Sequence, residues 1–327
     1  MKIKDIGEFG LIGRLKAFEG KGLEAGIGED AAVLNFGQID LLFTTDLMVE
    51  GVHFLKGLTP ARAIGHRLLA ANLSDLAACG AEPLIYTVLL VVHPEERWEY
   101  VKEIYQGMKA LGEQFGASLA GGDISRGEQL LLGLALLGKV PRGRWVPRSG
   151  ARVGDAIFVS GSLGESALGL RQLKRGMREG PFVRRHLFPE PRLDLGRGLS
   201  ERGLVHAMID ISDGFLQDLG HILEASGVGA EIHLDRLPLE GDYLEECHRM
   251  GLDPLELALL GGEDYELIFT APEGRAEEVM DLGRQLGVRI EAVGRILQGG
   301  IRLLKDGRPY PLPRFTGYDH FRWASST

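Results

Sequence analysis

Apolar and polar positions follow two different periods along this chain. Short, nearly continuous apolar runs predict strands, at residues 41–45, 84–92, 130–137 and 156–160. Stretches in which apolar residues recur every three or four positions predict helices, at 60–78 and 95–115. The most apolar runs are less than half as long as a helix that crosses a bilayer, so we expect no membrane span. The pattern is typical of a mixed α/β protein.

A segment rich in proline, glycine and arginine, residues 141–150, divides the chain into two halves. The length of 327 residues is sufficient for two hydrophobic cores. We therefore predict an N-terminal domain over residues 1–145 and a C-terminal domain over residues 146–327. Within the second half, the charged and proline-containing stretch 178–192 is expected to be a surface excursion.

Charge and cysteine content exclude several classes of protein. The net charge of −9 disfavours a nucleic-acid-binding protein, which needs clustered Lys and Arg. Cys79 and Cys247 lie far apart and outside any C-x-x-C pattern, so neither a disulfide framework nor a zinc site is indicated. The first residues lack the apolar core and cleavage site of a signal peptide. We expect a cytoplasmic protein.

Acidic residues recur in turns that are rich in glycine or small residues. Six such turns are Gly28-Glu-Asp-Ala-Ala32, Thr44-Thr-Asp46, Asn72-Leu-Ser-Asp75, Gly121-Gly-Asp123, Asp210-Ile-Ser-Asp-Gly214 and Gly261-Gly-Glu-Asp264. Several follow an apolar run directly, so we expect their carboxylates to project from strand ends toward one edge of a sheet. A single Asp in a turn is usually a cap or an Asx-turn. Six together favour a bound cation, because Mg²⁺ prefers oxygen ligands and unpaired carboxylates repel one another.

Two of these positions allow more than one interpretation. Asn72 and Asp75 share a helix face with Leu68, and polar groups on a buried face need either backbone partners or a metal ion. His53 is either a structural histidine with satisfied hydrogen bonds or a contact to phosphate or substrate.

The common nucleotide-binding and hydrolase motifs are absent from the sequence. It contains no Walker A loop, no H-R-D loop, no G-x-S-x-G and no H-E-x-x-H. Gly26-Ile-Gly28 is only a fragment of a dinucleotide fingerprint, because the third glycine is missing. A kinase built from this chain therefore belongs to another lineage.

The acidic turns, in this order, resemble the thiamine-monophosphate kinase family. That family belongs to a superfamily with aminoimidazole ribonucleotide synthetase, selenophosphate synthetase and the hydrogenase maturation dehydratase. The resemblance spans essentially the whole chain. Three segments distinguish the kinase family within the superfamily: Val49-Glu-Gly-Val-His-Phe54, Gly261-Gly-Glu-Asp-Tyr-Glu-Leu267 and Gly317-Tyr-Asp-His-Phe321.

The resemblance implies a fold and a reaction. The fold is α/β, with an N-terminal mixed sheet that completes a barrel across a homodimer and a C-terminal α/β sandwich. The reaction is ATP-dependent phosphorylation of thiamine monophosphate to thiamine diphosphate, by direct in-line transfer on a carboxylate-held Mg²⁺ cluster. No general base is implied, because the acceptor phosphate is already an anion.

The resemblance also assigns roles to individual residues. The magnesium ligands would be Asp30, Thr44, Thr45, Asp46, Asp75, Asp123, Asp210 and Asp213. ATP would be contacted by Tyr105, Gly122, Asp123, Arg148 and Ser212. Thiamine monophosphate would be contacted by His53, Glu263 and Tyr318. The chain departs from the family pattern at Glu29, where Asp is usual, and at Ile124, where Thr is common.

Two rival interpretations remain. Another ATP-using member of the superfamily would share the acidic turns, although selenophosphate synthetase is disfavoured because no Cys lies near the N-terminus. A non-enzymatic metal- or nucleotide-binding scaffold could use the same turns. An ATP-turnover assay distinguishes that scaffold from an enzyme.

Overall fold

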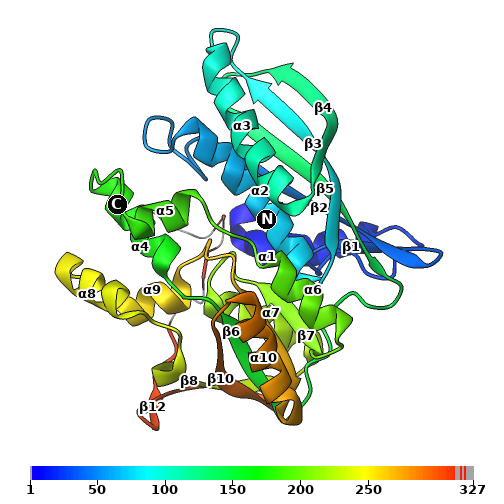
Figure 1. The fold of residues 1–327 in the computed structure, drawn as a ribbon, viewed down its shortest axis with the longest axis vertical. Helices are drawn as coiled ribbons and strands as arrows, with labels where there is room; N and C mark the ends of the chain where they lie inside the picture. The colour runs from blue at the N-terminus through cyan, green and yellow to red at the C-terminus, as the bar shows by residue number, and fades with distance from the viewer. Residues whose placement is uncertain (1, 314–316, 319, 322–327) are drawn as a thin grey trace.

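Two mixed β-sheets, one from each half of the chain, organise the structure (Figure 1). The computed structural model describes residues 2–313, 317–318 and 320–321. The first half supplies the strands β1 (Ala32–Phe36), β2 (Ile39–Val49), β3 (Glu82–Val92), β4 (Ser118–Arg126) and β5 (Leu131–Pro141). The second half supplies β6 (Asp155–Ser160), β7 (Ala207–Asp210), β8 (Gly229–His233), β9 (Leu267–Pro272), β10 (Ile290–Leu297), β11 (Ile301–Lys305) and β12 (Arg308–Tyr310).

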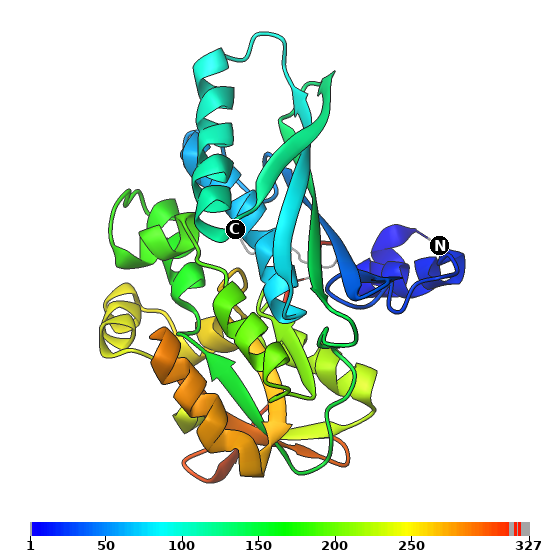
Figure 2. The ribbon, with the colours of Figure 1, turned by 45° about the vertical axis from the view of Figure 1, so that its right-hand side comes forward.

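Helices connect the strands and cover the sheets. The first half has α1 (Ile3–Leu15), α2 (Ala61–Ala78), α3 (Trp98–Phe115) and the short 3₁₀ helix η1 (Lys16–Phe18). The second half has α4 (Glu165–Lys174), α5 (Pro181–Leu187), α6 (Leu193–Glu201), α7 (Phe215–Ser226), α8 (Gly241–Met250), α9 (Pro254–Leu260), α10 (Ala276–Leu286), η2 (Leu234–Arg236) and η3 (Glu273–Arg275). Figure 2 shows α1 projecting from one side of the molecule. Among the residues that the structure describes, no helix is long and apolar enough to span a membrane.

The five-stranded sheet is open in one chain and has the order β1-β2-β5-β3-β4. Its neighbours are antiparallel except for β3 and β4, which are parallel. One transverse row of this sheet contains Asp46, Leu134, Val88 and Gly122. Gly122 is required by its surroundings, since a Cβ there would lie 1.9 Å from the carbonyl oxygen of Val88.

The seven-stranded sheet has the order β12-β11-β8-β10-β6-β9-β7. Strands β8 and β11 are parallel, and the other neighbouring pairs are antiparallel. β7 is an edge strand of four buried residues, and its last residue is Asp210.

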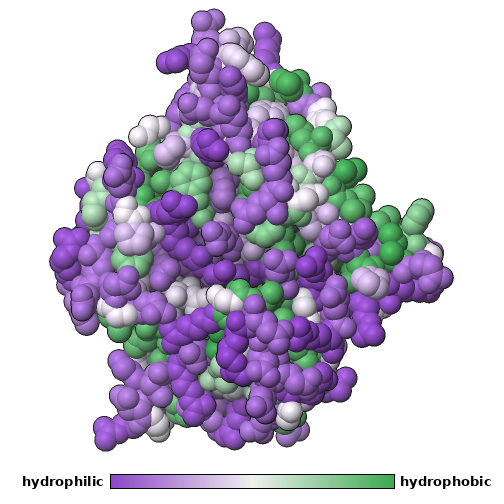
Figure 3. Space-filling model, viewed as in Figure 1, coloured by the Kyte–Doolittle hydropathy of each residue, from purple (hydrophilic) through white to green (hydrophobic). Residues whose placement is uncertain are grey.

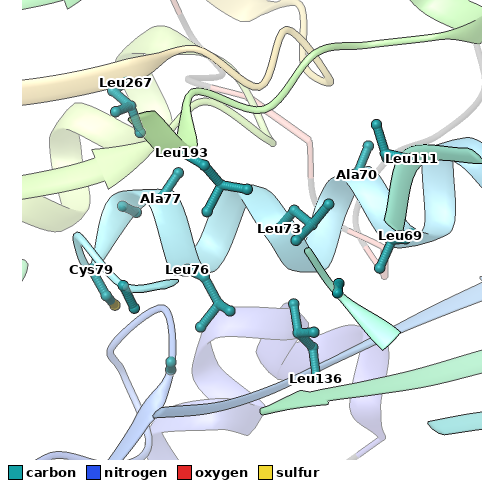
Figure 4. Close-up of a cluster of buried hydrophobic side chains, with 14 of the residues drawn as sticks. Leu69, Ala70, Leu73, Leu76, Ala77, Cys79, Leu111, Leu136, Leu193 and Leu267 are labelled. Atoms are coloured by element: carbon teal, nitrogen blue, oxygen red, sulfur yellow. The ribbon is translucent and has the colours of Figure 1, made fainter. Parts of the chain in front are cut away.

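Helix α2 lies between the two sheets and joins their cores. Fifteen of its eighteen residues are buried, as expected for a helix that is apolar around most of its circumference. Figure 4 shows Leu136 of β5 on one side of this helix and Leu193 and Leu267 of the second half on another. A residue on α2 can therefore contact groups from both halves of the chain.

Two glycines let α2 and α3 approach each other closely. A Cβ at Gly65 would lie 1.9 Å from the carbonyl oxygen of Ile104, and one at Gly107 would lie 2.0 Å from that of Arg62. These neighbours are backbone atoms of packed helices, so they cannot rotate away as a flexible side chain would.

We expect Gly107→Ala to destabilise the protein, because the added methyl group must push α2 and α3 apart. Overpacking of this kind costs about 1–3 kcal/mol. The matched control is Gly220→Ala on α7, where nothing lies within 4 Å of the new Cβ. That change is expected to be neutral or stabilising, because Ala favours helix over Gly. Thermal unfolding followed by circular dichroism measures both, and equal midpoints would contradict the prediction.

Most predicted elements are confirmed, and one expectation about the second half is wrong. The predicted strands and helices correspond to β2, β3, β5, β6, α2 and α3, although α3 begins at Trp98. The stretch 178–192 is not a surface excursion, because it contains α5, in which Phe182, Val183 and Leu187 are buried. Its arginines concealed the apolar face with which α5 packs against α4 and α2.

The linker between the sheets lies near the predicted boundary. β5 ends at Pro141 and β6 begins at Asp155. However, α5 and α6 of the second half pack against α2 of the first. The boundary at residues 145 and 146 stays a prediction.

Candidate active site

Three carboxylates from distant parts of the chain meet beside α2. Asp30 lies two residues before the start of β1, Asp75 lies on the last turn of α2, and Asp210 ends β7. One oxygen atom from each lies within 4.8 Å of the others. We call Asp30, Asp75 and Asp210 the carboxylate cluster.

Each member of the carboxylate cluster has one hydrogen-bond donor beside it. The Thr44 hydroxyl donates to Asp75, and the Ser74 hydroxyl donates to Asp210 Oδ2 at 2.7 Å. Arg148 Nη2 donates to Asp30 Oδ1 at 2.5 Å. These donors orient the carboxylates but provide only one positive charge for three acidic groups.

Burial and mutual repulsion raise the pKa values of the acidic groups here. Burial raises the pKa of Asp46 on β2 to about 6. Burial and then the charge of Asp30 raise the pKa of Asp210 to about 8. The pKa of Asp75 is raised well above its ordinary value by burial and by the charges of Asp46, Asp210 and Asp30. A cation that binds here would relieve this repulsion.

The donor set fits a hard cation such as Mg²⁺. Asp30 Oδ2 and Asp46 Oδ2 are buried and have no hydrogen-bond partner among the described residues. A buried carboxylate oxygen without a partner is costly, unless a ligand satisfies it. Oxygen-only donors are those that Mg²⁺ prefers.

The loop after β7 is held in place by a single carboxylate. Asp218 Oδ2 accepts hydrogen bonds from the backbone N–H groups of Ser212, Asp213 and Gly214, each at 3.1 Å. The carbonyl oxygen of Ser212 accepts a bond from the N–H of Glu263 at 2.8 Å. The loop beside the carboxylate cluster is thereby tied to the turn that carries Glu263.

His53 presents a defined tautomer. The backbone N–H of Val49 donates to Nδ1 of His53 at 3.0 Å, so the proton of the neutral ring lies on Nε2. Burial, followed by the charge of His320, lowers the pKa of His53. Its ring lies 5.0 Å from that of His320, which in turn lies 4.8 Å from that of Tyr318. The three rings come from the turn after β2 and from the C-terminal segment.

Glu263 carries a charge in a constrained position. Its backbone is left-handed, with a φ of 63°, which is uncommon for a residue with a side chain. Its carboxylate pairs with Arg67, and His186 Nδ1 lies 3.6 Å away. Burial by itself raises the pKa of Glu263. Arg67 and His186 together lower this pKa by more than burial raises it, so the net shift is downward. Glu263 is therefore an ionised group at neutral pH.

A second buried hydrogen-bond network holds the residues that follow Glu263. Glu266 is fully buried and is bound by Arg185, by Arg192 and by the Ser160 hydroxyl. Asp264 accepts from the N–H groups of Gly164 and Ser166. These contacts anchor residues 264–266 at the start of β9, which leaves the preceding Glu263 at the edge of the anchored segment.

Comparison with known proteins assigns the chain to a family. The N-terminal and C-terminal domain models of AIR synthase related protein match residues 28–140 and 152–304. The thiamine-monophosphate kinase of Aquifex aeolicus is 37% identical over 305 residues, covering 91% of this chain and 94% of that one. That of Salmonella typhimurium is 40% identical over 309 residues, covering 91% and 92%. The chain belongs to the thiamine-monophosphate kinase family.

A solved structure in this family has the same fold. The structure "AaThiL complexed with AMPPCP and TMP" superposes with a TM-score of 0.86 at 34% identity, and the match covers 98% of this chain and 99% of that one. The two-domain α/β fold with mixed sheets, expected from the sequence, is therefore confirmed. The barrel expected across a dimer is not tested by this superposition and stays a prediction.

The structure brings together most of the residues that the family resemblance selects. Asp30, Asp75 and Asp210 form the carboxylate cluster, and Thr44, Asp46 and Arg148 interact with it. Ser212 and Asp213 follow Asp210 in the next loop, and the carbonyl of Asp213 accepts from the N–H of Tyr318 at 3.2 Å. Asp319, in the terminal motif, lies outside the described residues.

The other selected residues lie elsewhere in this chain. Side chains alternate along β2, so Thr45 faces the opposite, exposed side of the sheet from Thr44 and Asp46. Gly122 and Asp123 lie on β4, which is exposed along its whole length. Tyr105 lies on α3 and packs against the first core. The roles predicted for these residues stay predictions.

Several residues in the site were not selected from the sequence. Ser74 lies within the Asn72–Asp75 motif, but only the folded structure shows its hydrogen bond to Asp210. Asp218 and Arg67 had no distinguishing pattern at all, since their partners are a loop and a residue 196 positions away. For Asn72, Nδ2 donates to the carbonyl of Leu68 at 2.9 Å, whereas Oδ1 is buried without a hydrogen-bond partner among the described residues, so both interpretations stay open.

The departure at Glu29 also has a structural counterpart. Its carboxylate accepts from the backbone N–H of Arg148 at 2.7 Å, and Arg148 Nη1 donates to the carbonyl of Gly28 at 3.2 Å. The longer side chain thus secures the segment that supplies Arg148 to the carboxylate cluster.

Proposed function

We propose that this protein transfers the γ-phosphoryl group of ATP to the phosphate of thiamine monophosphate, producing thiamine diphosphate and ADP. An oxygen of the acceptor phosphate forms the new P–O bond, and the bond to ADP breaks. The observation that carries the proposal is the carboxylate cluster with its unpartnered oxygens, beside a charged Glu263 and a neutral His53. Membership of the thiamine-monophosphate kinase family supports the choice of substrates.

The carboxylates provide a place for magnesium between two anions. Asp30, Asp46, Asp75 and Asp210 would hold the ions, with Thr44 as a neighbouring oxygen donor. Bound Mg²⁺ would neutralise charge on the phosphates and orient them for in-line displacement. Asp213 and the exposed Asp123 are further ligands suggested by the family pattern.

The acceptor is expected to bind on the side of His53 and Glu263. The Nε2–H of His53 is available to donate to a phosphate oxygen, because Nδ1 is occupied by the Val49 N–H. The ionised Glu263 suits the cationic thiazolium of thiamine, and the ring of Tyr318 offers an aromatic face. Arg148 and Ser212, next to the carboxylate cluster, would contact the nucleotide.

A homodimer would bury an exposed apolar surface. The face of the five-stranded sheet opposite α2 exposes Phe43, Leu47, Ile85 and Leu89, the last to 55%. Figure 3 shows hydrophobic side chains gathered along this side of the molecule. Exposed apolar patches of this kind mark interaction sites. Within one chain, β4 lies three strand spacings from β2, about 14 Å, so Asp123 is remote from Asp46.

We expect Leu89→Glu to shift the protein from dimer to monomer, because a charge would be buried in the proposed interface. The control is Val153→Glu, a residue that is 62% exposed in the second half and lies off this face. Sedimentation velocity at micromolar concentration measures both variants and the unmodified protein. A monomeric unmodified protein would overturn the dimer.

A product assay tests the proposed function directly. ATP, Mg²⁺ and thiamine monophosphate are incubated with the protein, and thiamine diphosphate and ADP are quantified by chromatography. Equal amounts of the two products are expected. ADP formation without thiamine diphosphate would favour another ATP-using member of the superfamily, and the absence of any ADP would favour a binding scaffold.

A further inference from the structure

Arg67 is an unusual residue for the centre of a helix core. It lies on α2, its side chain is 1% exposed, and it is the largest of the fully buried side chains. Nη1 donates to the carbonyl oxygen of His53 at 3.1 Å, and Nη2 donates to the carboxylate of Glu263. Nε is buried without a hydrogen-bond partner among the described residues.

These contacts join two segments that are distant in sequence. The His53 segment follows β2 of the first sheet, and Glu263 precedes β9 of the second. α2 also carries Asp75, two turns further along the same helix. One rigid helix therefore sets the position of both the acceptor-side groups and the carboxylate cluster.

A purely structural role explains the arrangement poorly. Burying an ion pair is seldom more stabilising than packing apolar side chains of similar volume. Here one partner, Glu263, has a side chain that is 29% exposed, so the pair holds a carboxylate at the surface of the site. Glu263 also has a left-handed backbone and an N–H bonded to Ser212. The position of Glu263 is therefore constrained by its ion pair with Arg67, by its backbone conformation and by its backbone hydrogen bond.

We propose that Arg67 is a positioning residue for the acceptor, which fixes the Glu263 carboxylate and the His53 segment at one separation. Arg67 does not touch substrate, because its side chain is buried. It acts through Glu263 and His53, whose arrangement receives thiamine monophosphate with its phosphate toward the carboxylate cluster. This inference rests on the proposed function.

Two substitutions separate positioning from stability. Arg67→Met removes both hydrogen bonds and the charge, and we expect KM for thiamine monophosphate to rise about 10- to 100-fold. The Kd of an ATP analogue, measured by calorimetry, should stay within about 2-fold of the unmodified protein, because Arg148 and Ser212 are untouched. Arg67→Lys keeps the charge but can reach only one of the two partners, so it should restore part of the affinity.

A double-variant cycle tests whether Arg67 acts through Glu263. In the Glu263→Gln background, Arg67→Met should raise KM for thiamine monophosphate by less than one-third of its effect in the unmodified protein. The control is Arg289→Met, which removes an arginine that pairs with Glu240 and Glu291 in the second half and has no contact with the Glu263 turn. It is expected to leave KM for thiamine monophosphate unchanged.

The possible results decide between the alternatives. Unchanged KM in folded Arg67→Met, fully additive effects in the cycle, or a failure of both Arg67 variants to fold would overturn the positioning role. If the unmodified protein neither binds nor converts thiamine monophosphate, the proposed function fails, and this inference fails with it. If it converts the substrate and only the Arg67 results differ from expectation, the inference alone fails.

Discussion

Asp46→Asn is expected to lower kcat by roughly two to four orders of magnitude while making the metal-free protein more stable. The variant loses a charged oxygen donor beside Asp75 and Asp210, so magnesium and the phosphates would be held in the wrong arrangement. The same change removes a buried carboxylate whose Oδ2 has no hydrogen-bond partner among the described residues. A lower kcat together with a higher stability of the metal-free protein is expected if the Asp46 carboxylate is needed for activity and destabilises the fold.

The stability difference should depend on pH with a defined sign. Burial raises the pKa of Asp46 from its ordinary value of 3.8 to about 6 in the folded protein. The folded state therefore loses stability as pH rises from below 4 through 6, where this carboxyl ionises, whereas an amide does not titrate. The advantage of the variant should be about 1–3 kcal/mol at pH 7.5 and should disappear near pH 4.

The measurements are ADP formation at saturating Mg²⁺ and thermal unfolding in the presence of a chelator. The matched control is Asp40→Asn, on the same strand, where a buried carboxylate accepts from the N–H of Gly143 at 2.7 Å away from the site. It should leave turnover unchanged. If Asp46→Asn is unfolded, the residue is structural; full turnover by the folded variant, or by the unmodified protein without divalent metal, would also overturn the assignment.

Free thiamine is expected to be a very poor acceptor, with kcat/KM at least about a thousandfold below that for thiamine monophosphate. A phosphate monoester is already anionic at neutral pH, and it brings oxygen ligands for the ions between Asp30, Asp75 and Asp210. The hydroxyl of thiamine must lose a proton during attack, and no general base is proposed for this site. The shorter molecule would also place its oxygen farther from the donor phosphate.

Steady-state kinetics with both acceptors measure this ratio at fixed ATP and Mg²⁺. ADP release without an acceptor is subtracted, so that slow hydrolysis is not counted as transfer. Thiamine added as an inhibitor of the monophosphate reaction shows whether it binds. Turnover of thiamine at a rate comparable to the monophosphate would refute the anionic-nucleophile argument, since it would require a base that the site residues named above do not supply.

The sequence alone determined the class of fold and most of the regular elements, and it predicted the chemistry of the site. Short, nearly continuous apolar runs predicted β2, β3, β5 and β6, because runs of this kind are typical of strands in the interior of a sheet. The acidic turns predicted oxygen ligands for a cation because carboxylates are rarely gathered without one. The order of these motifs matched a family, and that match extended along nearly the whole chain.

Only the tertiary structure decided which of those residues meet. Asp30, Asp75 and Asp210 stand in sequence motifs similar to that of Asp123. Only the first three come together, because α2 packs between the sheets while β4 lies at an exposed edge. Asp46 was expected at a strand end and lies inside β2.

Arg67 had no local signal, since a buried arginine on an apolar helix is explained only by partners from elsewhere. Its partners, His53 and Glu263, come from the first and the second half of the chain. A sequence motif shows which chemical groups a segment carries. The distances between groups in different segments depend on how the helices and sheets pack.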